Sequence, residues 1–344
     1  MDTKLPVSLV VKLDRFKLQS VARGLLPDHR VAKCYRVRIS ENVNVNYAES
    51  IKSAFYTGLM VCGSIWACPV CASKISERRK KELDTVDFSA YTLFMVTVTI
   101  SHKKDDTLKN LTVGLGQAWR SVRSGRWWSK FKSDYKIVGS FTAQEVTWGP
   151  GTGWHPHKHI LFLSSSKSIN LDEVKRALYS RYQGNLLKRN GHASFEHGIT
   201  ISFADDDVTE YISKFVKWGH VAELTKGTVK RARSVDRYQA FDLLASDSPF
   251  VQSKFIEYVS VFSGSRQLVA SPGLRELLGL NEVELTDAEL AEGDTKEKYI
   301  LLSSLSASQW KIILKKKIRG QVIYLASMGD AELLNDYLQS EGVQ

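Results

Sequence analysis

The sequence predicts an α+β protein with an antiparallel β-sheet core flanked by helices, an N-terminal element that carries cysteines, and a small helical C-terminal module. Three observations support this fold class: β-branched and aromatic runs alternate with helical patterns, a Gly-Pro-Gly turn at 149–151 joins two of these runs, and the composition changes near residue 280. The chain has 43% hydrophobic and 25% charged residues, which is an ordinary globular composition and excludes a disordered polyampholyte or a coiled-coil rod.

The elements are expected in the following order along the chain. Strand-like segments at 36–39 and 57–62 and a basic helix at 74–83 precede strands at 91–100, 137–148, 157–163 and 199–203 and helices at 108–135, 171–188, 207–218, 251–262 and 274–278. The boundaries divide the chain into an N-terminal region (1–90), a central domain (91–280) and a C-terminal module (281–344).

The charge of the chain points to an anionic partner. The formal net charge is +11, and residues 282–297 hold seven acids against one lysine, so the positive charge is concentrated elsewhere. Nucleic acid is the simplest partner for such a chain. No apolar run is long enough for a membrane span and the first residues lack a signal-peptide core, so we expect a cytoplasmic protein with no membrane partner.

The four cysteines predict a structural zinc site. Cys62, Cys68 and Cys71 form a Cys-x5-Cys-x2-Cys cluster, and Cys34 completes a set of four. Disulfide bonds are disfavoured in a reducing compartment. Four cysteine thiolates form a common tetrahedral Zn²⁺ site. Four buried free thiols, or a redox Cys-x-x-Cys pair, are the alternatives.

A histidine-rich strand predicts a second metal site. His155, His157 and His159 occupy alternate positions, and alternate side chains of a strand share one face. His157 and His159 are the better pair because Pro156 interrupts the ladder next to His155. Glu145 is the best third ligand, since it faces them across a hairpin, and Gln144 is the weaker choice. The alternative is a solvent-exposed edge rich in histidine.

A later helical segment carries Tyr211 and Lys214 at positions i and i+3, on one helix face. An isolated tyrosine is usually a core residue. Beside a metal site, however, its oxygen can attack a metal-polarised phosphate and become covalently attached, while the lysine neutralises charge.

Together these residues resemble the rolling-circle replication initiator (Rep) proteins, the HUH endonuclease group. His157-Lys158-His159 resembles the family's His-x-His motif, Tyr211-x-x-Lys214 its Tyr-x-x-Lys motif, and FMVTVTI at 94–100 the strand that precedes the metal site. Lys158 replaces a residue that is usually apolar in the family. Phe215 stands where some relatives carry a second tyrosine, so Tyr211 is the expected nucleophile.

The resemblance implies an HUH-like nicking domain at 91–280 that cuts one strand of an origin, single-stranded or in a hairpin, and keeps the 5′ end on tyrosine. It also implies catalytic Mg²⁺ or Mn²⁺ and the initiation of plasmid or phage replication. Because the chain has no GxxxxGK[ST] motif, a host helicase and a host DNA polymerase are expected partners. The oligomeric state, monomer or dimer, stays open.

Two other functions fit part of the sequence. A non-catalytic, zinc-containing DNA-binding regulator explains the cysteines and the charge but not the histidine strand. A related HUH transposase or relaxase shares the chemistry, although relaxases often place the tyrosine before the histidines.

Basic residues near these motifs are the candidate DNA contacts. Three tryptophans are interleaved with cations between residues 108 and 136, a composition that suits single-stranded DNA, while a helix with buried tryptophans and solvated charges is the alternative. The candidates are Arg78, Arg79, Arg120, Arg123, Lys158, Lys230, Arg231 and Arg233.

Overall fold

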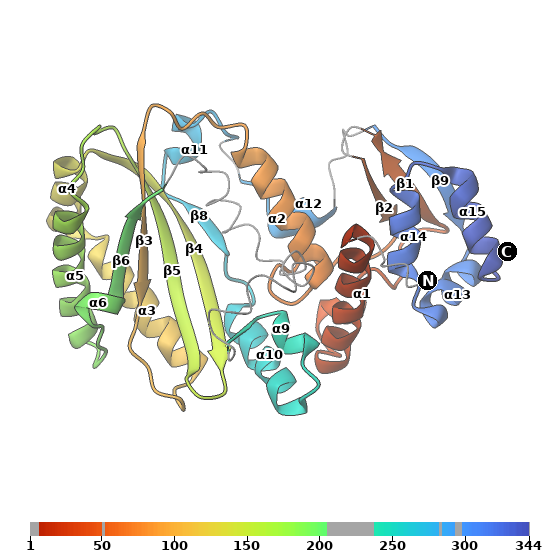
Figure 1. Cartoon of the computed structure of the whole chain (residues 1–344), viewed down its shortest axis with the longest axis horizontal. Coiled ribbons are helices and arrows are strands. Elements are labelled where there is room, and N and C mark those ends of the chain that lie inside the picture. The colour runs from red at the N-terminus through yellow and green to blue at the C-terminus, as the bar shows by residue number, and fades with distance from the viewer. Residues whose placement is uncertain (1–6, 50–51, 205–236, 282–283, 293–297, 344) are drawn as a thin grey trace.

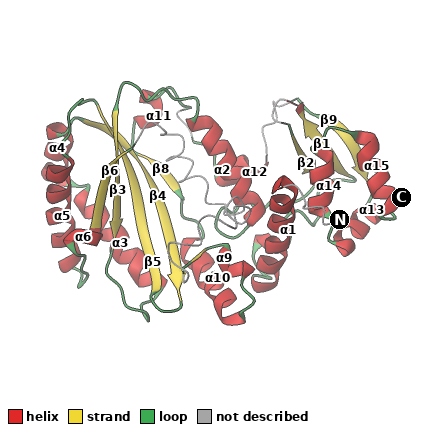
Figure 2. Ribbon diagram, viewed as in Figure 1, coloured by secondary structure: helices red, strands yellow, loops and turns green. Residues whose placement is uncertain are grey.

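The computed structural model describes residues 7–49, 52–204, 237–281, 284–292 and 298–343 (Figure 1). It contains two antiparallel sheets with helices around both (Figure 2). The predicted fold class is therefore confirmed: a mixed α+β protein whose antiparallel sheets are flanked by helices.

The larger sheet carries the histidine strand near its centre. Its strand order is β6-β3-β5-β4-β7, and β8 also pairs with β4. The bounds are β3 Thr92–Thr99, β4 Ile137–Gly149, β5 Gly153–Ser164, β6 Ile199–Phe203, β7 Tyr238–Gln239 and β8 Leu268–Ala270. The long β4–β5 hairpin turns at 150–152, as the Gly-Pro-Gly sequence predicts.

The two faces of this sheet have different covers. One face packs, through Phe94, Ile160 and Phe162, against helices α3 (Leu108–Val122), α4 (Gly125–Asp134) and α5 (Leu171–Leu187). The other face packs, through Met95 and Leu161, against α2 (Pro69–Leu83) and α11 (Leu274–Leu277), which lie on the opposite side of the sheet in Figure 1. The alternation of a strand therefore decides which environment each side chain enters.

The smaller sheet joins the two ends of the chain. β1 (Val43–Ala48) lies between β2 (Ser53–Thr57) and β9 (Ile300–Leu305). The expected C-terminal helices are present as α13 (Ala307–Lys316), α14 (Arg319–Ala326) and α15 (Ala331–Ser340), and α14 packs against α1 (Val7–Leu25). The C-terminal module thus contains a strand that the sequence did not predict, and that strand pairs with the N-terminal region.

The remaining elements connect or cap these layers. They are η1 (Arg30–Ala32), α6 (Phe195–Gly198), α9 (Asp242–Ala245), α10 (Pro249–Phe262) and α12 (Asp287–Glu292). No helix in the described ranges is both long and apolar enough to cross a membrane.

Three local predictions need correction. Residues 36–39 and 57–62 contribute an isolated bridge between Arg38 and Leu59, and the strands lie at β1 and β2 instead. The helix expected at 108–135 is broken into α3 and α4, because Ser124 is extended and Gly125 has φ = 71°. The histidine strand begins at Gly153, so it includes His155. The helix predicted at 207–218 lies outside the described residues.

Candidate functional site

The pairing of β4 with β5 brings Glu145, His157 and His159 together. Glu145 lies opposite His157, and Ala143 lies opposite His159, so the three functional side chains project from the same face of the sheet. They occupy the face that carries Met95 and Leu161, away from helices α3 to α5. Ile160 and Leu161, both fully buried, anchor the strand beside them.

The three side chains converge on one point. The same carboxylate oxygen, Glu145 Oε2, lies 2.9 Å from His157 Nε2 and 2.7 Å from His159 Nε2. Ligand atoms of all three residues lie within 4.8 Å of one another, and the side chains are only 12 to 22% exposed. Two imidazoles and a carboxylate in this arrangement could bind a divalent ion.

Hydrogen bonds to the opposite ring nitrogens orient both imidazoles. Thr97 Oγ1 on β3 lies 2.9 Å from His159 Nδ1, and the main-chain oxygen of His155 lies 3.2 Å from His157 Nδ1. With Nδ1 occupied, each ring presents Nε2 to Glu145, as ligating histidines commonly do. Thr97 was not a candidate from the sequence, because its role follows from the register in which β3 pairs with β5.

The site favours an ionised Glu145 carboxylate and a neutral His159 ring. Burial alone would raise the pKa of Glu145, but hydrogen bonds and charge from His157 and His159 outweigh burial and lower it to about 2. Burial lowers the pKa of His159 below its ordinary value despite the hydrogen bond to Glu145. A neutral imidazole and an ionised carboxylate are the protonation states in which each group binds a metal.

The two weaker ligand candidates lie elsewhere. Gln144 is on the opposite face of the sheet, where its Oε1 accepts a hydrogen bond from Lys158 Nζ at 2.8 Å. His155 pairs with His102, with 2.9 Å between His155 Nδ1 and His102 Nε2, and burial together with the charge of its neighbours lowers the pKa of His155 to about 4.

The four cysteines meet in a second buried cluster. The sulfur of Cys34 lies 3.5 Å from that of Cys71 and 3.8 Å from that of Cys68, and the sulfurs of Cys62 and Cys71 are 3.6 Å apart. Four sulfurs at about 2.3 Å from a common zinc ion would lie about 3.8 Å from one another. All four thiols are free, so the cluster could bind a metal, as the sequence predicts.

Cys68 also determines where the basic helix begins. It is the N-cap of α2, where its sulfur accepts a hydrogen bond from the main-chain N–H of Cys71, and Pro69 follows at the first helical position. The Cys-Pro-Val-Cys turn therefore presents two sulfurs to the cluster and starts α2 in a fixed direction.

Comparison with known proteins gives two relatives. Over 68% of this chain and 67% of the relative, the sequence is 26% identical to "Protein rep" of Streptomyces lividans. The chain is related to a Rep protein. The resemblance to Rep proteins expected from the sequence motifs is thereby confirmed.

The second relative matches a shorter part of the Rep-like chain. It is a "Neomycin resistance protein" of Streptomyces cyanogenus, 28% identical over 34% of this chain and 33% of its own length. No protein-family model matches the chain, and no solved structure matches it.

The two arginines of α2 that were expected to bind DNA contact other residues of the protein instead. Arg79 is 4% exposed, and its guanidinium lies 2.7 Å from Asp287 and 3.7 Å from Glu284. Arg78 donates to the main-chain oxygen of Leu290 at 2.7 Å. The acidic segment that the composition singled out thus lies, through α12, against the basic helix.

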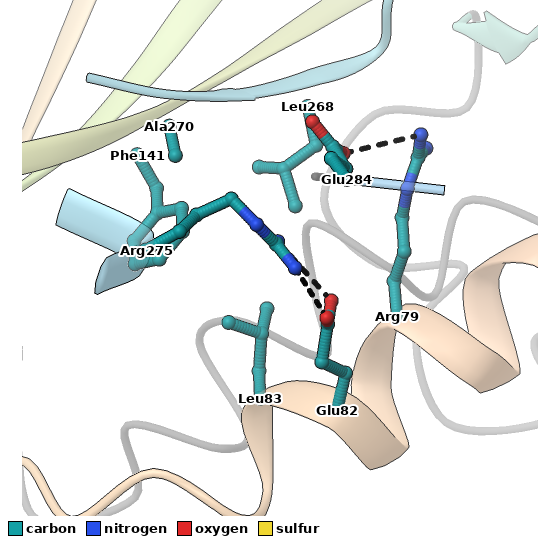
Figure 3. A pocket seen from close by; sticks show the side chains of 8 residues that line it. All are labelled: Arg79, Glu82, Leu83, Phe141, Leu268, Ala270, Arg275 and Glu284. Atoms are coloured by element: carbon teal, nitrogen blue, oxygen red, sulfur yellow. Dashed lines mark hydrogen bonds and ion pairs between the residues drawn. The ribbon is translucent and has the colours of Figure 1, made fainter. Parts of the chain in front are cut away.

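A small pocket opens beside these contacts, between α2 and β8 (Figure 3). In it Arg275 forms an ion pair with Glu82, and Arg79 reaches toward Glu284. The two arginines face two glutamates, so the pocket has no excess of either charge.

The other expected DNA contacts fall into two groups. Lys158 lies on the helix-covered face of the sheet, and burial with the charges of Arg123 and Arg120 lowers its pKa to about 8. Arg120 and Arg123 are exposed at the C-terminal end of α3. The residues Tyr211, Lys214, Lys230, Arg231 and Arg233 lie outside the described part of the chain.

Proposed function

We propose that this chain is a site-specific, single-strand DNA endonuclease and ligase that nicks an origin to initiate rolling-circle replication. The observation that carries the proposal is the convergence of His157, His159 and Glu145 in a chain related to a Rep protein. A DNA-binding regulator has no need for such a group on the face of a sheet. A plasmid or phage origin would be the substrate.

We assign Mg²⁺ or Mn²⁺ to the Glu145, His157 and His159 group. A bound divalent ion would act there as a Lewis acid on the scissile phosphate. The chain's own residues would hold it through two Nε2 atoms and one carboxylate oxygen, and Thr97 would keep the His159 ring in place.

Tyr211 is the proposed nucleophile. Its oxygen would attack the phosphorus, the bond to the 3′ oxygen would break, and that oxygen would leave as a 3′-hydroxyl while the 5′-phosphate stays on the tyrosine. Lys214, three positions later in the sequence, would neutralise the phosphate or the developing phenolate. Rejoining reverses the step, when a 3′-hydroxyl attacks the phosphotyrosine. A host DNA polymerase would extend the free 3′-hydroxyl, and a host helicase would open the duplex.

The cysteine cluster would hold a structural Zn²⁺. The sulfur separations of 3.5 to 3.8 Å fit a tetrahedral zinc site better than a disulfide. The ion would hold residues 34 and 62 to the start of α2, and it takes no part in the cleavage.

The proposal is tested by trapping the covalent intermediate. The protein is incubated with a labelled single-stranded origin oligonucleotide and Mn²⁺, and the products are separated on a denaturing gel. We expect a protein–DNA adduct that needs Mn²⁺ and disappears in Tyr211→Phe, with Tyr238→Phe as the matched control. An adduct that survives in Tyr211→Phe would refute the nucleophile, and no adduct with any strand of the origin would favour the regulator.

A further inference from the structure

The outer side of helices α3, α4 and α5 carries most of the chain's excess positive charge. Residues 108–136 and 171–189 contain twelve Lys and Arg against three Asp and Glu, in a chain whose net charge is +11. We call the exposed side of these three helices the outer helical surface. Its exposed cations include Arg120, Arg123, Arg126, Lys132, Arg176 and, just after α4, Lys136.

This surface lies on the opposite side of the sheet from the metal group. Helices α3, α4 and α5 lie on one side of the sheet in Figure 1. They cover the face of Ile160 and Phe162, whereas His157 and His159 project from the other face. A DNA segment bound at Glu145 and the histidines therefore cannot contact the outer helical surface at the same time. The positive charge there is not explained by the proposed nicking site.

Within the part of the chain that the structure describes, the cations of this surface have few acidic partners. Among the described residues, Lys130 pairs with Asp134 at 2.9 Å, and none of the six exposed cations named above forms an ion pair. Burial, and then the charge of Arg120, lowers the pKa of Arg123, as expected where like charges crowd together. The basic helix α2 differs, since its Arg79 forms ion pairs with Glu284 and with Asp287 at the start of α12.

The tryptophans of the same helices already pack against other aromatic side chains of the chain. Trp119 is 1% exposed and packs against Tyr182. Trp127 and Trp128 stack on Phe131 with ring centroids 5.2 and 5.3 Å apart, and the guanidinium of Arg181 lies over Trp127. Binding of single strands relies on free aromatic platforms as well as cations, whereas binding of a duplex relies on cations that match its phosphates.

From this placement we infer that the outer helical surface binds the phosphate backbone of duplex DNA, at a site separate from the metal group. Helix α5 has 17 residues, or about 25 Å, which matches roughly seven base pairs of duplex. The surface would hold the double-stranded DNA that flanks an origin while the opposite face works on one strand. The biological role of this surface rests on the proposed function, but the test of DNA binding does not.

The test removes three charges from this surface and three from elsewhere. Arg126→Gln/Lys132→Gln/Arg176→Gln is compared with the control Lys311→Gln/Lys315→Gln/Lys317→Gln, which changes exposed lysines of the C-terminal module by the same charge. The probes are a labelled 20-base-pair duplex of arbitrary sequence and a 20-nucleotide single strand. Fluorescence anisotropy gives both affinities over a series of NaCl concentrations, and thermal melting checks that each variant is folded.

We expect the surface variant to bind the duplex about 10-fold more weakly than the control does, with a salt-dependence slope lower by about 2 to 3. Its affinity for the single strand should stay within about twofold of the control. Equal duplex affinities in the two variants would overturn the inference, and so would an equal loss of duplex and single-strand binding. The probes need no cleavage, so a chain that forms no tyrosine adduct could still confirm this surface.

Discussion

Glu145 is the residue that makes the two histidines a site. Its single oxygen Oε2 lies 2.9 Å from His157 Nε2 and 2.7 Å from His159 Nε2, so the three groups already point at one position before any ion binds. A low pKa of about 2 keeps the carboxylate ionised at any physiological pH. Preorganisation of this kind saves the cost of turning side chains when the ion arrives.

Removing one imidazole should abolish cleavage and spare DNA affinity. In His157→Ala we expect adduct formation to fall by about 100-fold or more, because stabilisation of developing charge on the phosphate depends on the bound ion. Duplex affinity should stay within about twofold, because phosphate contacts elsewhere supply most of it. The denaturing-gel assay and anisotropy measure the two effects, and His197→Ala, an exposed histidine of α6, is the control. Retained cleavage in His157→Ala would contradict the ligand assignment.

Thr97 should matter through the orientation of His159. Its hydroxyl lies 2.9 Å from His159 Nδ1. Thr97→Val keeps the shape of the side chain but removes the hydroxyl that contacts the ring. We expect the Mn²⁺ affinity, measured by titration calorimetry, to fall about 10- to 100-fold. Thr97→Ser keeps the hydroxyl and should restore most of it. Equal Mn²⁺ affinities in the Val and Ser variants would show that the hydroxyl has no such role.

The three proposed metal ligands could be predicted at this scale, whereas the residues that support them could not. The alternation of a strand is enough to put His157 and His159 on one face, and the hairpin turn at 150–152 then brings Glu145 opposite. Thr97 depends on a strand far away in the sequence, whose register no local pattern determines. His102 is missed for the same reason: it meets His155 only in the folded chain.

At the scale of elements, the acidic helix α12 neutralises part of the positive charge of the basic helix α2. Arg79 is almost fully buried, and a buried guanidinium needs a carboxylate partner. Burial raises the pKa of Asp287 although Arg79 opposes that change, so the carboxylate itself gains little from the pair. Its main contribution is to neutralise Arg79.

Asp287→Asn should therefore destabilise the protein through its partner. Arg79 keeps Glu284 at 3.7 Å, so we expect a loss of about 1–3 kcal/mol rather than the larger cost of a fully unpaired buried charge. Urea unfolding measures the change. The double variant Arg79→Met/Asp287→Asn should recover part of the loss, since it removes the buried cation as well. A double variant as unstable as the sum of the two single variants would contradict this coupling.

Element prediction succeeded where the pattern was local and failed where pairing decided it. The strands around the histidines and the helices α5 and α10 follow from apolar periodicity and caps. β9 is a short run that becomes a strand because β1, more than 250 positions earlier, offers it an edge. The break between α3 and α4 had a signal in Ser124-Gly125, which a continuous helical reading overlooks.

At the scale of the molecule, the positive charge is concentrated on one side of the larger sheet. The net charge of +11 predicts an anionic partner, but only the fold shows that Asp287 of the acidic segment pairs with Arg79 of α2, whereas no described acidic residue pairs with the six exposed cations named above on the outer helical surface. The proposed domain division meets a similar complication, since β9 of the C-terminal module pairs with β1 of the N-terminal region. No composition change could reveal that these two regions share a sheet.

Arg319, in α14 of the C-terminal module, connects that module to the cysteine cluster. Its guanidinium donates to Gln19 Oε1 at 2.8 Å and to the main-chain oxygen of Tyr35 at 3.0 Å, and Gln19 in turn donates to the sulfur of Cys68 at 3.2 Å. Burial lowers the pKa of Arg319 to about 10, which reflects the cost of a buried cation. A zinc ion with four thiolates would leave two negative charges nearby, and these would offset that cost.

The variant Arg319→Met should for this reason weaken a metal site built from distant residues. We expect about 10-fold faster loss of zinc to a chromogenic chelator and a lower Tm, because the cluster loses both a nearby cation and the hydrogen bond that holds Gln19 against Cys68. Lys315→Met, an exposed cation of α13, is the control, and Cys68→Ser sets the scale for complete loss of the metal. If Arg319→Met kept zinc as firmly as Lys315→Met, the C-terminal module would share the sheet of the N-terminal region without supporting its metal site.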